Sequence, residues 1–272
     1  MPTFKPAAHH FVRHPGLPHL ELRTATSSRD CYQTHTHDEY SFGIIDAGQA
    51  VYTHGPNSTA LKPGMTVMME PGLAHACNPD AQQAWSYRML FVDAQWVHQS
   101  FLPLAGATHP TRLQLAQHST DKPAVYLALG RIADALVHRS TDALEVDEWL
   151  LTFIAQHALV PRVTTTQPGA DEQAVHAVRA LICAQVERDL SLAQLAQASG
   201  LDAYQLIRKF KQAFGQTPHA FQIDQRLNRA KTLLKQGAGL ADVAHQLGFA
   251  DQAHFQRHFK KRHATTPGNY MG

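Results

Sequence analysis

The sequence predicts an α+β protein of two domains: an N-terminal antiparallel β-barrel with flanking helices, then an all-α domain. A chain of 272 residues is long enough for both. Residues 20–92 consist of short apolar runs separated by Gly, Pro, Asn and Asp, which is typical of an antiparallel barrel or sandwich. From about residue 123, apolar residues recur at helical spacing. Within this helical part, residues 200–221 closely resemble residues 248–270, so one helical unit occurs twice.

Charge is divided unevenly along the chain. The net charge is +2, but residues 172–272 hold 13 Lys and Arg against 7 Asp and Glu, whereas residues 1–171 hold 11 against 15. A basic C-terminal module indicates an anionic partner such as nucleic acid. Three cysteines without a CxxC pair indicate a reducing compartment. Because we find no signal-peptide pattern and no apolar run of about 18 residues, we expect a cytoplasmic protein that does not enter the membrane.

The boundary between the domains follows from a change of pattern. The barrel strands are expected in runs such as "YSFGIIDAGQAVYTH", "LKPGMTVMMEPG" and "WSYRMLFVD". Residues 124–139 and 146–160 place apolar residues at i, i+3, i+4 and i+7, which predicts two amphipathic helices. Residues 161–173, "PRVTTTQPGADEQ", have no periodicity and indicate a linker. We therefore divide the chain into domain 1–160, linker 161–173 and domain 174–272.

The first helical unit is expected at residues 190–215. Ser191 is a suitable N-cap for its first helix, which would end at Gly200 in a left-handed conformation. Asp202 can cap the second helix, which we expect to run to about Gly215. A short helix, a tight turn and a second helix make the helix-turn-helix pattern of DNA-binding proteins.

The second unit, expected at residues 240–263, repeats this pattern, with Asp251 as the cap of its last helix. A long helix should join the units, since Thr217 can cap it and Pro218 suits its first position. About 19 residues of helix are about 28 Å long. Successive major-groove faces on one side of B-DNA are about 34 Å apart. This connector could therefore place two recognition helices in consecutive grooves of one duplex.

The last helix of each unit has an apolar side and a polar side. Leu206 and Phe210 in the first unit, and Phe255 and Phe259 in the second, should pack inward. Arg can contact a guanine, and Gln an adenine, through two hydrogen bonds in the major groove. The expected base-reading residues are Tyr204, Ile207, Arg208, Gln252, His254, Gln256 and Arg257. The expected phosphate contacts, which position rather than specify, are Lys209, Lys211, Arg226, Arg229, Lys260 and Lys261.

Five motifs of this helical part resemble the AraC/XylS family of bacterial transcription regulators. They are "LAQLAQASGL", "LIRKFKQAFGQTPHAF", "RLNRAKTLL", "VAHQLGFADQAHFQRHFKK" and "TPGNY". The resemblance implies an AraC-type DNA-binding domain with two helix-turn-helix units and supports the base-reading roles above. One departure lies at Ala264, where the family usually has Gly before Thr-Pro. If that position needs a positive φ, Ala would be strained there.

The barrel carries a His-x-His pair and a later His. "HTHDEYSFGIIDAGQ" and "LKPGMTVMMEPGLAHACNP" resemble the two strand motifs of the cupin (jelly-roll) barrel, in which such histidines converge. Metal-binding cupins usually place a Glu four or five residues after the second His, where this chain has Ser41 and Phe42. We therefore expect no cofactor; a divalent metal, if one binds, would be held by His35, His37 and His75.

The barrel interior is the expected site of a small-molecule effector, because small barrels with open mouths commonly hold ligands. The residues expected to line it are His35, His37, Glu39, Tyr40, His75, Trp85, Tyr87 and Met89. Helices 124–139 and 146–160 resemble the dimerisation helices of the family, which implies a homodimer. Their alternative role is to cover the barrel.

These patterns predict a sequence-specific, effector-controlled transcription regulator that binds double-stranded promoter DNA and is not an enzyme. RNA polymerase is a further candidate partner. Two alternatives remain open. One is a metal-dependent cupin enzyme fused to a DNA-binding module. The other is an architectural DNA-binding protein whose barrel is only a dimerisation scaffold and binds no effector.

Overall fold

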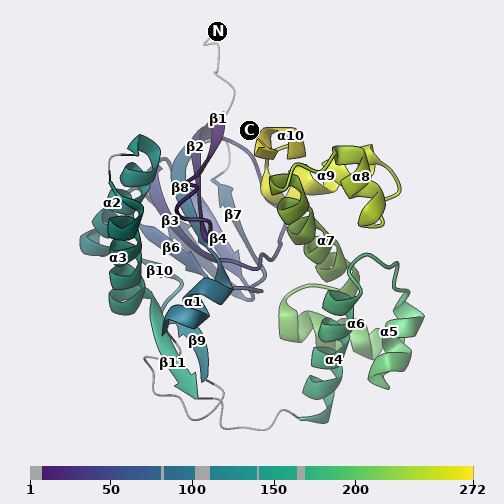
Figure 1. Ribbon diagram of the computed structural model, residues 1–272. Helices are drawn as coiled ribbons and strands as arrows, with labels where there is room; N and C mark the ends of the chain where they lie inside the picture. The colour runs from purple at the N-terminus through teal and green to yellow at the C-terminus, as the bar shows by residue number, and fades with distance from the viewer. Residues whose placement is uncertain (1–7, 81–82, 102–110, 140, 164–168, 272) are drawn as a thin grey trace.

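The computed structural model describes residues 8–80, 83–101, 111–139, 141–163 and 169–271. A β-rich N-terminal domain lies beside a helical C-terminal domain (Figure 1). The strands are β1 (Ala8–Arg13), β2 (Leu20–Ser28), β3 (Tyr40–Ala47), β4 (Ala50–His54), β5 (Asn57–Leu61), β6 (Thr66–Met69), β7 (His75–Pro79), β8 (Trp85–Val92), β9 (Thr111–Leu115), β10 (Ser119–Thr120) and β11 (Leu159–Val163). None of the helices in the described part of the chain is long and apolar enough to span a membrane.

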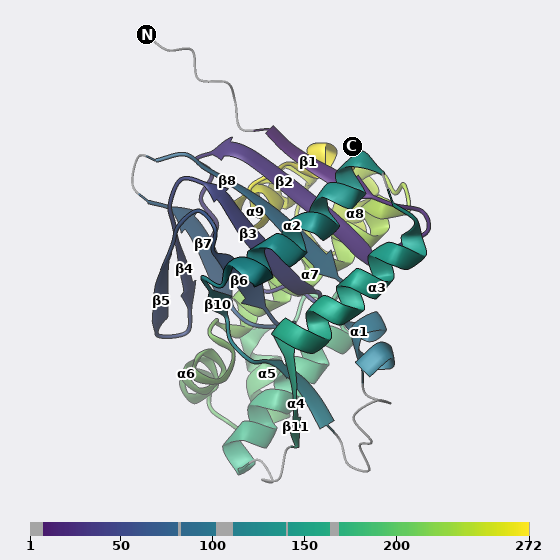
Figure 2. The same cartoon turned by 90° about the vertical axis from the view of Figure 1, so that its left-hand side faces the viewer.

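Two main sheets, both antiparallel, form the β-rich domain. The larger has the strand order β1-β2-β8-β3-β6-β10, and the smaller has the order β5-β4-β7. Helices α2 (Pro123–His138) and α3 (Ala143–Phe153) cover the outer face of the larger sheet (Figure 2). Along β3, the alternate residues Tyr40, Phe42 and Ile44 pack toward these helices. The opposite face of the sheet looks inward, so one strand supplies both the helix-packed core and the barrel interior.

The structure differs from the expected elements of the first domain in three places. Residues 159–163 form β11, which pairs with β9, so the first domain extends past residue 160. The helix expected at 146–160 ends as α3 at Phe153 and passes through a π-helical turn, Ile154–Ala158, into that strand. Helix α1 (Ala94–Phe101) was not expected. Pairing with β9 explains the first two changes, since tertiary pairing overrides local helical periodicity.

The C-terminal domain is helical throughout its described length. It contains α4 (Ala170–Ala184), α5 (Leu192–Ser199), α6 (Ala203–Phe214), α7 (Pro218–Lys235), α8 (Leu240–Gln246), α9 (Gln252–His263) and α10 (Pro267–Met271). Helix α4 begins at Ala170, inside the expected linker. Most side chains of α7 are buried, because the helix packs between the two helical units and also faces the barrel (Figure 1).

Polar contacts join the two domains. The Thr36 main-chain N–H donates to the Asp224 carboxylate at 2.9 Å. Lys231 Nζ lies 2.6 Å from Glu39 Oε1. On the edge strand β1, the Arg13 guanidinium donates to the Tyr270 carbonyl at 2.9 Å. Residues among the first 40 of the chain therefore contact residues among the last 50. No local sequence pattern predicts these contacts.

Candidate functional site

Helix α6 is built as a helix-turn-helix recognition helix requires. The Asp202 carboxylate accepts from the Gln205 N–H at 2.9 Å and so satisfies an otherwise unpaired donor. Leu206 and Phe210 are fully buried and fix the helix on α4 and α7. On the other side, Tyr204 is 76% exposed. The expected base-reading residue Arg208 is also exposed, and Ile207 is half-buried beside it.

Helix α9 repeats this construction. Asp251 accepts from the His254 N–H, and the Phe255 and Phe259 rings are fully buried. Gln252 and Arg257 are exposed, while His254 and Gln256 are half-buried. All seven expected base-reading residues thus lie on two recognition helices with solvent-facing polar sides. Units α5–α6 and α8–α9 lie toward opposite ends of α7 (Figure 1), which is about 27 Å long for its 18 residues.

The expected phosphate contacts divide into three groups. Lys211, Arg229, Lys260 and Lys261 are exposed. Lys209 is half-buried and contacts the Asp171 carboxylate. Arg226 corrects the expectation: it is buried, and its guanidinium donates to the carbonyls of Val186, Arg188 and Gly248 at 2.9–3.1 Å. Those carbonyls belong to loops of both helical units, so Arg226 holds the two units together and is unavailable to a phosphate.

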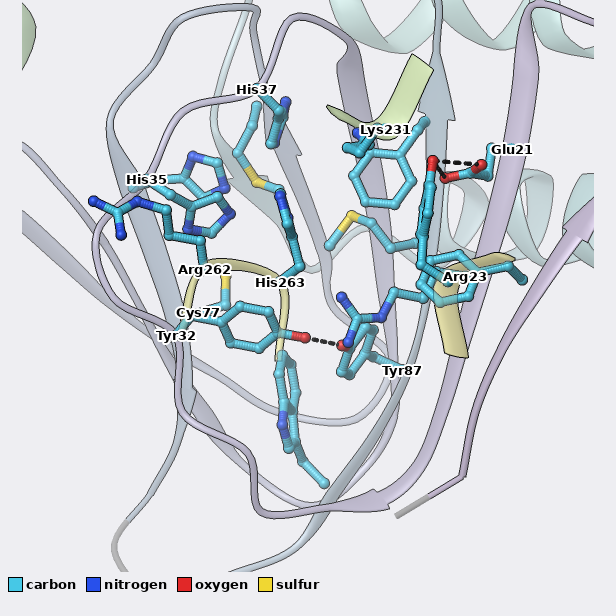
Figure 3. Close-up of a pocket in the computed structure, with 17 residues that line it drawn as sticks. Glu21, Arg23, Tyr32, His35, His37, Cys77, Tyr87, Lys231, Arg262 and His263 are labelled. Carbon is cyan, nitrogen blue, oxygen red and sulfur yellow. Dashed lines mark hydrogen bonds between the residues drawn. The ribbon is translucent and has the colours of Figure 1, made fainter. Parts of the chain in front are cut away.

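A cavity of about 60 Å³ lies between the inner face of the barrel and the helical domain (Figure 3). A volume of this size admits only a small ligand. The barrel lines it with Phe11, Glu21, Arg23, Tyr32, His35, His37, Met69, His75, Cys77, Trp85, Tyr87, Met89 and Phe91. The helical domain closes it with Lys231, Arg262, His263 and Tyr270.

Three histidines of the barrel have a defined proton arrangement. The Nδ1 atoms of His35, His37 and His75 lie 2.8–2.9 Å from the carbonyls of Gln33, Glu39 and Leu73, respectively. A carbonyl only accepts, so each Nδ1 carries the proton and each Nε2 of a neutral ring is an acceptor. Burial lowers the pKa of His75 to about 4, and burial with neighbouring charge holds the pKa values of His35 and His37 well below the ordinary value. The rings are therefore neutral near pH 7.

The expected pocket residues are mostly, but not all, brought together. His35, His37, His75, Trp85, Tyr87 and Met89 line the cavity. Tyr40 corrects the expectation, because the two-residue period of β3 turns it to the outer face, where it contacts His98 of α1. Glu39 lies next to the cavity, and its carboxylate is engaged by Lys231.

Several cavity residues were missed by sequence reasoning. Arg23 and Tyr32 belong to the barrel, and Lys231, His263 and Tyr270 come from the helical domain. A charged residue on an expected barrel strand, such as the Arg of "LELRTA", is a signal that could have been followed. The helical-domain residues gave no such signal, since a basic residue on a DNA-binding module is ordinarily exposed.

The three barrel histidines lie close together, with ring centroids of His35 and His37 at 4.7 and 4.8 Å from that of His75. As they are placed, the described residues contain no group of three or more His, Cys, Asp or Glu side chains that could hold a metal ion. Arg262, Lys231 and Arg23 also line the cavity. Arg262 is paired with Asp224 and Lys231 with Glu39. Arg23 has no carboxylate within salt-bridge distance among the described residues, and its positive charge disfavours a cation beside it.

Comparisons with known proteins agree with both halves of this description. A family model for an AraC-like ligand binding domain matches residues 17–154, half of the chain, and a helix-turn-helix domain model matches residues 175–272. The HTH-type transcriptional regulator YbfI of Bacillus subtilis is 26% identical over 240 residues, covering 87% of this chain and 86% of that protein.

A second relative and a solved structure extend the likeness over most of the chain. The HTH-type transcriptional activator RhaS of Pectobacterium carotovorum is 22% identical, covering 91% of this chain and 89% of that protein. The crystal structure of ToxT from Vibrio cholerae O395 has the same fold, with a TM-score of 0.59 at 12% identity, covering 93% of this chain and 97% of that one.

Proposed function

The chain belongs to the AraC/XylS family of DNA-binding transcription regulators with a ligand-binding domain, and from this premise we propose how its two domains divide the work. Helices α6 and α9 enter consecutive major-groove segments of one promoter duplex. A small effector binds the cavity between the barrel and the helical domain. The observation that carries this proposal is the shared lining of that cavity, to which both domains contribute side chains.

Base reading is assigned to the exposed sides of the two recognition helices. Arg208 and Arg257 occupy corresponding positions in the two units, and each can donate two hydrogen bonds to one guanine. Tyr204, Ile207, Gln252, His254 and Gln256 complete the two reading surfaces. The exposed Lys211, Arg229, Lys260 and Lys261 supply phosphate contacts, which fix register without reading sequence.

Regulation follows from where the cavity lies. Lys231 of α7 and His263 of α9 close it against the barrel. A ligand held there contacts residues of α9, the second recognition helix, as well as the barrel. It therefore binds the arrangement with the domains together more tightly than any arrangement with the cavity opened. Only such a difference in affinity can shift the population of domain arrangements, and so change the fit of the two units to DNA.

We also propose that the protein is a homodimer through α2 and α3. Leu127 of α2 is 65% exposed and Leu144 of α3 is 72% exposed, although both helices bury their opposite sides on the sheet. Large exposed apolar side chains on adjacent helices are typical of a protein–protein interface. RNA polymerase remains a candidate partner at the promoter. Binding of chromosomal DNA would place the protein in the cytoplasm.

We propose no enzymatic activity. The relatives of this chain are transcriptional regulators. The metal-dependent enzyme considered above would need a bound metal together with turnover of a substrate. Metal analysis of the purified protein tests that alternative directly.

The experiment that tests the regulator is selection of genomic DNA fragments by the purified protein, followed by salt titration on the best fragment. We expect a tight site with two half-sites about one helical turn apart and a steep fall of affinity with salt. Weak binding that is independent of sequence, with and without candidate effectors, would contradict the proposal.

A further inference from the structure

Arg23 on β2 is buried among aromatic rings in the cavity. Arg23 is 4% exposed. Its Cζ lies 5.5 Å from the ring centroids of both Phe11 and Tyr32 and 5.9 Å from the ring centroid of Tyr87 (Figure 3). No Asp or Glu oxygen among the described residues lies within salt-bridge distance of its guanidinium. A buried charge without a directly paired carboxylate is costly. Glu21 also lines the cavity, but its carboxylate is engaged by Arg13 and Lys235.

The groups that contact Arg23 do not supply a negative charge. Its Nη2 donates to His9 Nδ1 at 3.1 Å, and the Nε2 of the same ring hydrogen-bonds the Asp30 carboxylate. The His9 ring therefore separates Arg23 from that carboxylate. Burial raises the pKa values of Tyr32 and Tyr87, which therefore stay neutral phenols. Arg23 Nε is buried and has no hydrogen-bond partner in the described protein.

A second unused donor lies beside Arg23. The Tyr32 and Tyr87 hydroxyls contact each other (Figure 3). Two hydroxyls hold two hydrogens, and their mutual hydrogen bond uses one of them. The other hydrogen is left to donate, next to the unpaired Nε–H of Arg23. The Arg23 Cζ lies 5.5 and 5.9 Å from the ring centroids of Tyr32 and Tyr87. A charged donor and a neutral donor in one cluster can serve the two oxygens of a carboxylate.

The other side of the cavity presents acceptors. The Nε2 atoms of His35 and His75 have no hydrogen-bond partner in the described protein, because each ring uses only its Nδ1–H. Neutral Nε2 atoms accept a hydrogen bond from a hydroxyl. Tyr32 links the two sides, since its ring lies 5.9 Å from that of His35 and under the Arg23 guanidinium. The cavity thus offers donors at Arg23 and the Tyr32–Tyr87 pair and acceptors at the Nε2 atoms of His35 and His75.

We propose that this cavity binds a small hydroxycarboxylic acid, with its carboxylate on Arg23 and the Tyr32–Tyr87 pair and its hydroxyl donating to the Nε2 of His35 or of His75. The volume of about 60 Å³ restricts the ligand to a small acid, and lactate is the probe of this class. This inference rests on the proposed function only in taking the cavity as the effector site. It names the ligand class and the residues that select it.

The test is isothermal titration of the full chain with lactate and two matched analogues. Propionate keeps the carboxylate and lacks the hydroxyl, while lactamide keeps the hydroxyl and lacks the charge. We expect both to bind at least about tenfold more weakly than lactate, because each leaves buried polar groups unpaired. Equal binding of the three compounds, or no binding of lactate, overturns the proposal. Since wild-type protein is used, this result does not depend on the folding of a variant.

Arg23→Met separates a ligand-binding role from a structural one. Replacing an unpaired buried charge by an apolar side chain of similar length should leave the thermal midpoint of the ligand-free protein unchanged or higher. Lactate should no longer raise that midpoint. A lower midpoint without ligand, or undiminished stabilisation by lactate, counts against the assignment. If the wild-type protein binds DNA sequence-specifically but does not bind lactate, this inference alone is refuted. If it binds lactate but shows no sequence-specific DNA binding, the proposed function alone is refuted.

Discussion

Lys231 of α7 and Glu39 of the barrel form an ion pair across the domain boundary, with Nζ 2.6 Å from Oε1. The Lys231 side chain is 8% exposed. Burial opposes charge on both groups, but their mutual attraction outweighs it, so the pKa of Glu39 is lowered and that of Lys231 is raised. The pair is therefore charged across the whole neutral range and holds the helical domain against the cavity.

We predict that Lys231→Met will open the interface between the domains. Glu39 Oε2 is already buried without a partner, and loss of the lysine would leave the whole carboxylate unpaired at a cost of about 3–5 kcal/mol. Small-angle X-ray scattering should show a larger radius of gyration. The double variant Lys231→Met/Glu39→Gln, which removes both charges, should return toward wild type. An unchanged scattering profile in the single variant would show that the pair does not hold the domains together.

Stability should fall as the pH is lowered from about 6.5 toward 4. The buried histidines have folded-state pKa values below the ordinary value, chiefly because of burial, and for His75 the value is about 4. In this window the unfolded chain binds protons that the folded chain does not, so each such ring lowers the free energy of unfolding by about 1.4 kcal/mol per pH unit.

His75→Asn should reduce this pH dependence by about the contribution of one ring. The Asn amide can still donate to the Leu73 carbonyl, as the His75 Nδ1–H does. Urea unfolding at pH 7 and pH 5 measures the effect. The exposed His219 supplies the control, since His219→Asn also removes one histidine but does not touch the cavity. The same pH dependence in both variants would argue against the buried cluster as its source.

Arg208→Ala or Arg257→Ala should weaken binding to the best DNA site by about 1–3 kcal/mol and relax specificity there. Both side chains are exposed on recognition helices. Lys211→Ala is the comparison, because a phosphate contact should affect all sequences alike and lower the salt slope by about 1. Competition assays with the selected site and random DNA distinguish the cases. An equal loss on random DNA for the Arg variants would be inconsistent with base reading.

Arg226→Ala should destabilise the helical domain by about 1–3 kcal/mol, because three carbonyls would lose their shared donor. Arg229, three residues along α7, is exposed. Arg229→Ala should therefore leave the unfolding midpoint unchanged and weaken DNA binding only. Thermal unfolding of the two variants side by side makes the comparison. Equal midpoints would mean that the Arg226 hydrogen bonds contribute little.

Ala264→Gly should stabilise the protein by about 0.5–1 kcal/mol. Ala264 ends α9 with φ of +49°, a left-handed conformation that disfavours a side chain and favours glycine. Ala253→Gly on the same helix is the matched control. Ala253 is exposed and helical, so glycine there should destabilise by a similar amount. Chemical denaturation measures both. Destabilisation by Ala264→Gly would show that the buried methyl group outweighs the backbone strain.

The sequence by itself determined the features that depend on neighbouring residues. Helix starts and helix faces follow short, regular spacings. The sequence therefore predicted the caps at Asp202, Thr217 and Asp251 and the apolar positions of α6 and α9. The tight turn at Ala264 could also be anticipated, since the matching position of such a motif usually holds glycine. These signals sufficed for the two-domain architecture and for the helices that carry the expected base-reading residues.

Tertiary structure alone decided which side chains share the cavity. Because side chains alternate between the two faces of β3, Tyr40 points away from the cavity. Packing of α7 and α9 against the barrel places Lys231 and His263 in the cavity lining. Arg226 is buried and joins the helical units, whereas Arg229 is exposed. Both are arginines of the same helix, and no local sequence pattern distinguishes them. A cavity is formed by residues that are distant in the chain, and the energy of a buried charge depends on its partners in space. Neither is encoded in local spacing.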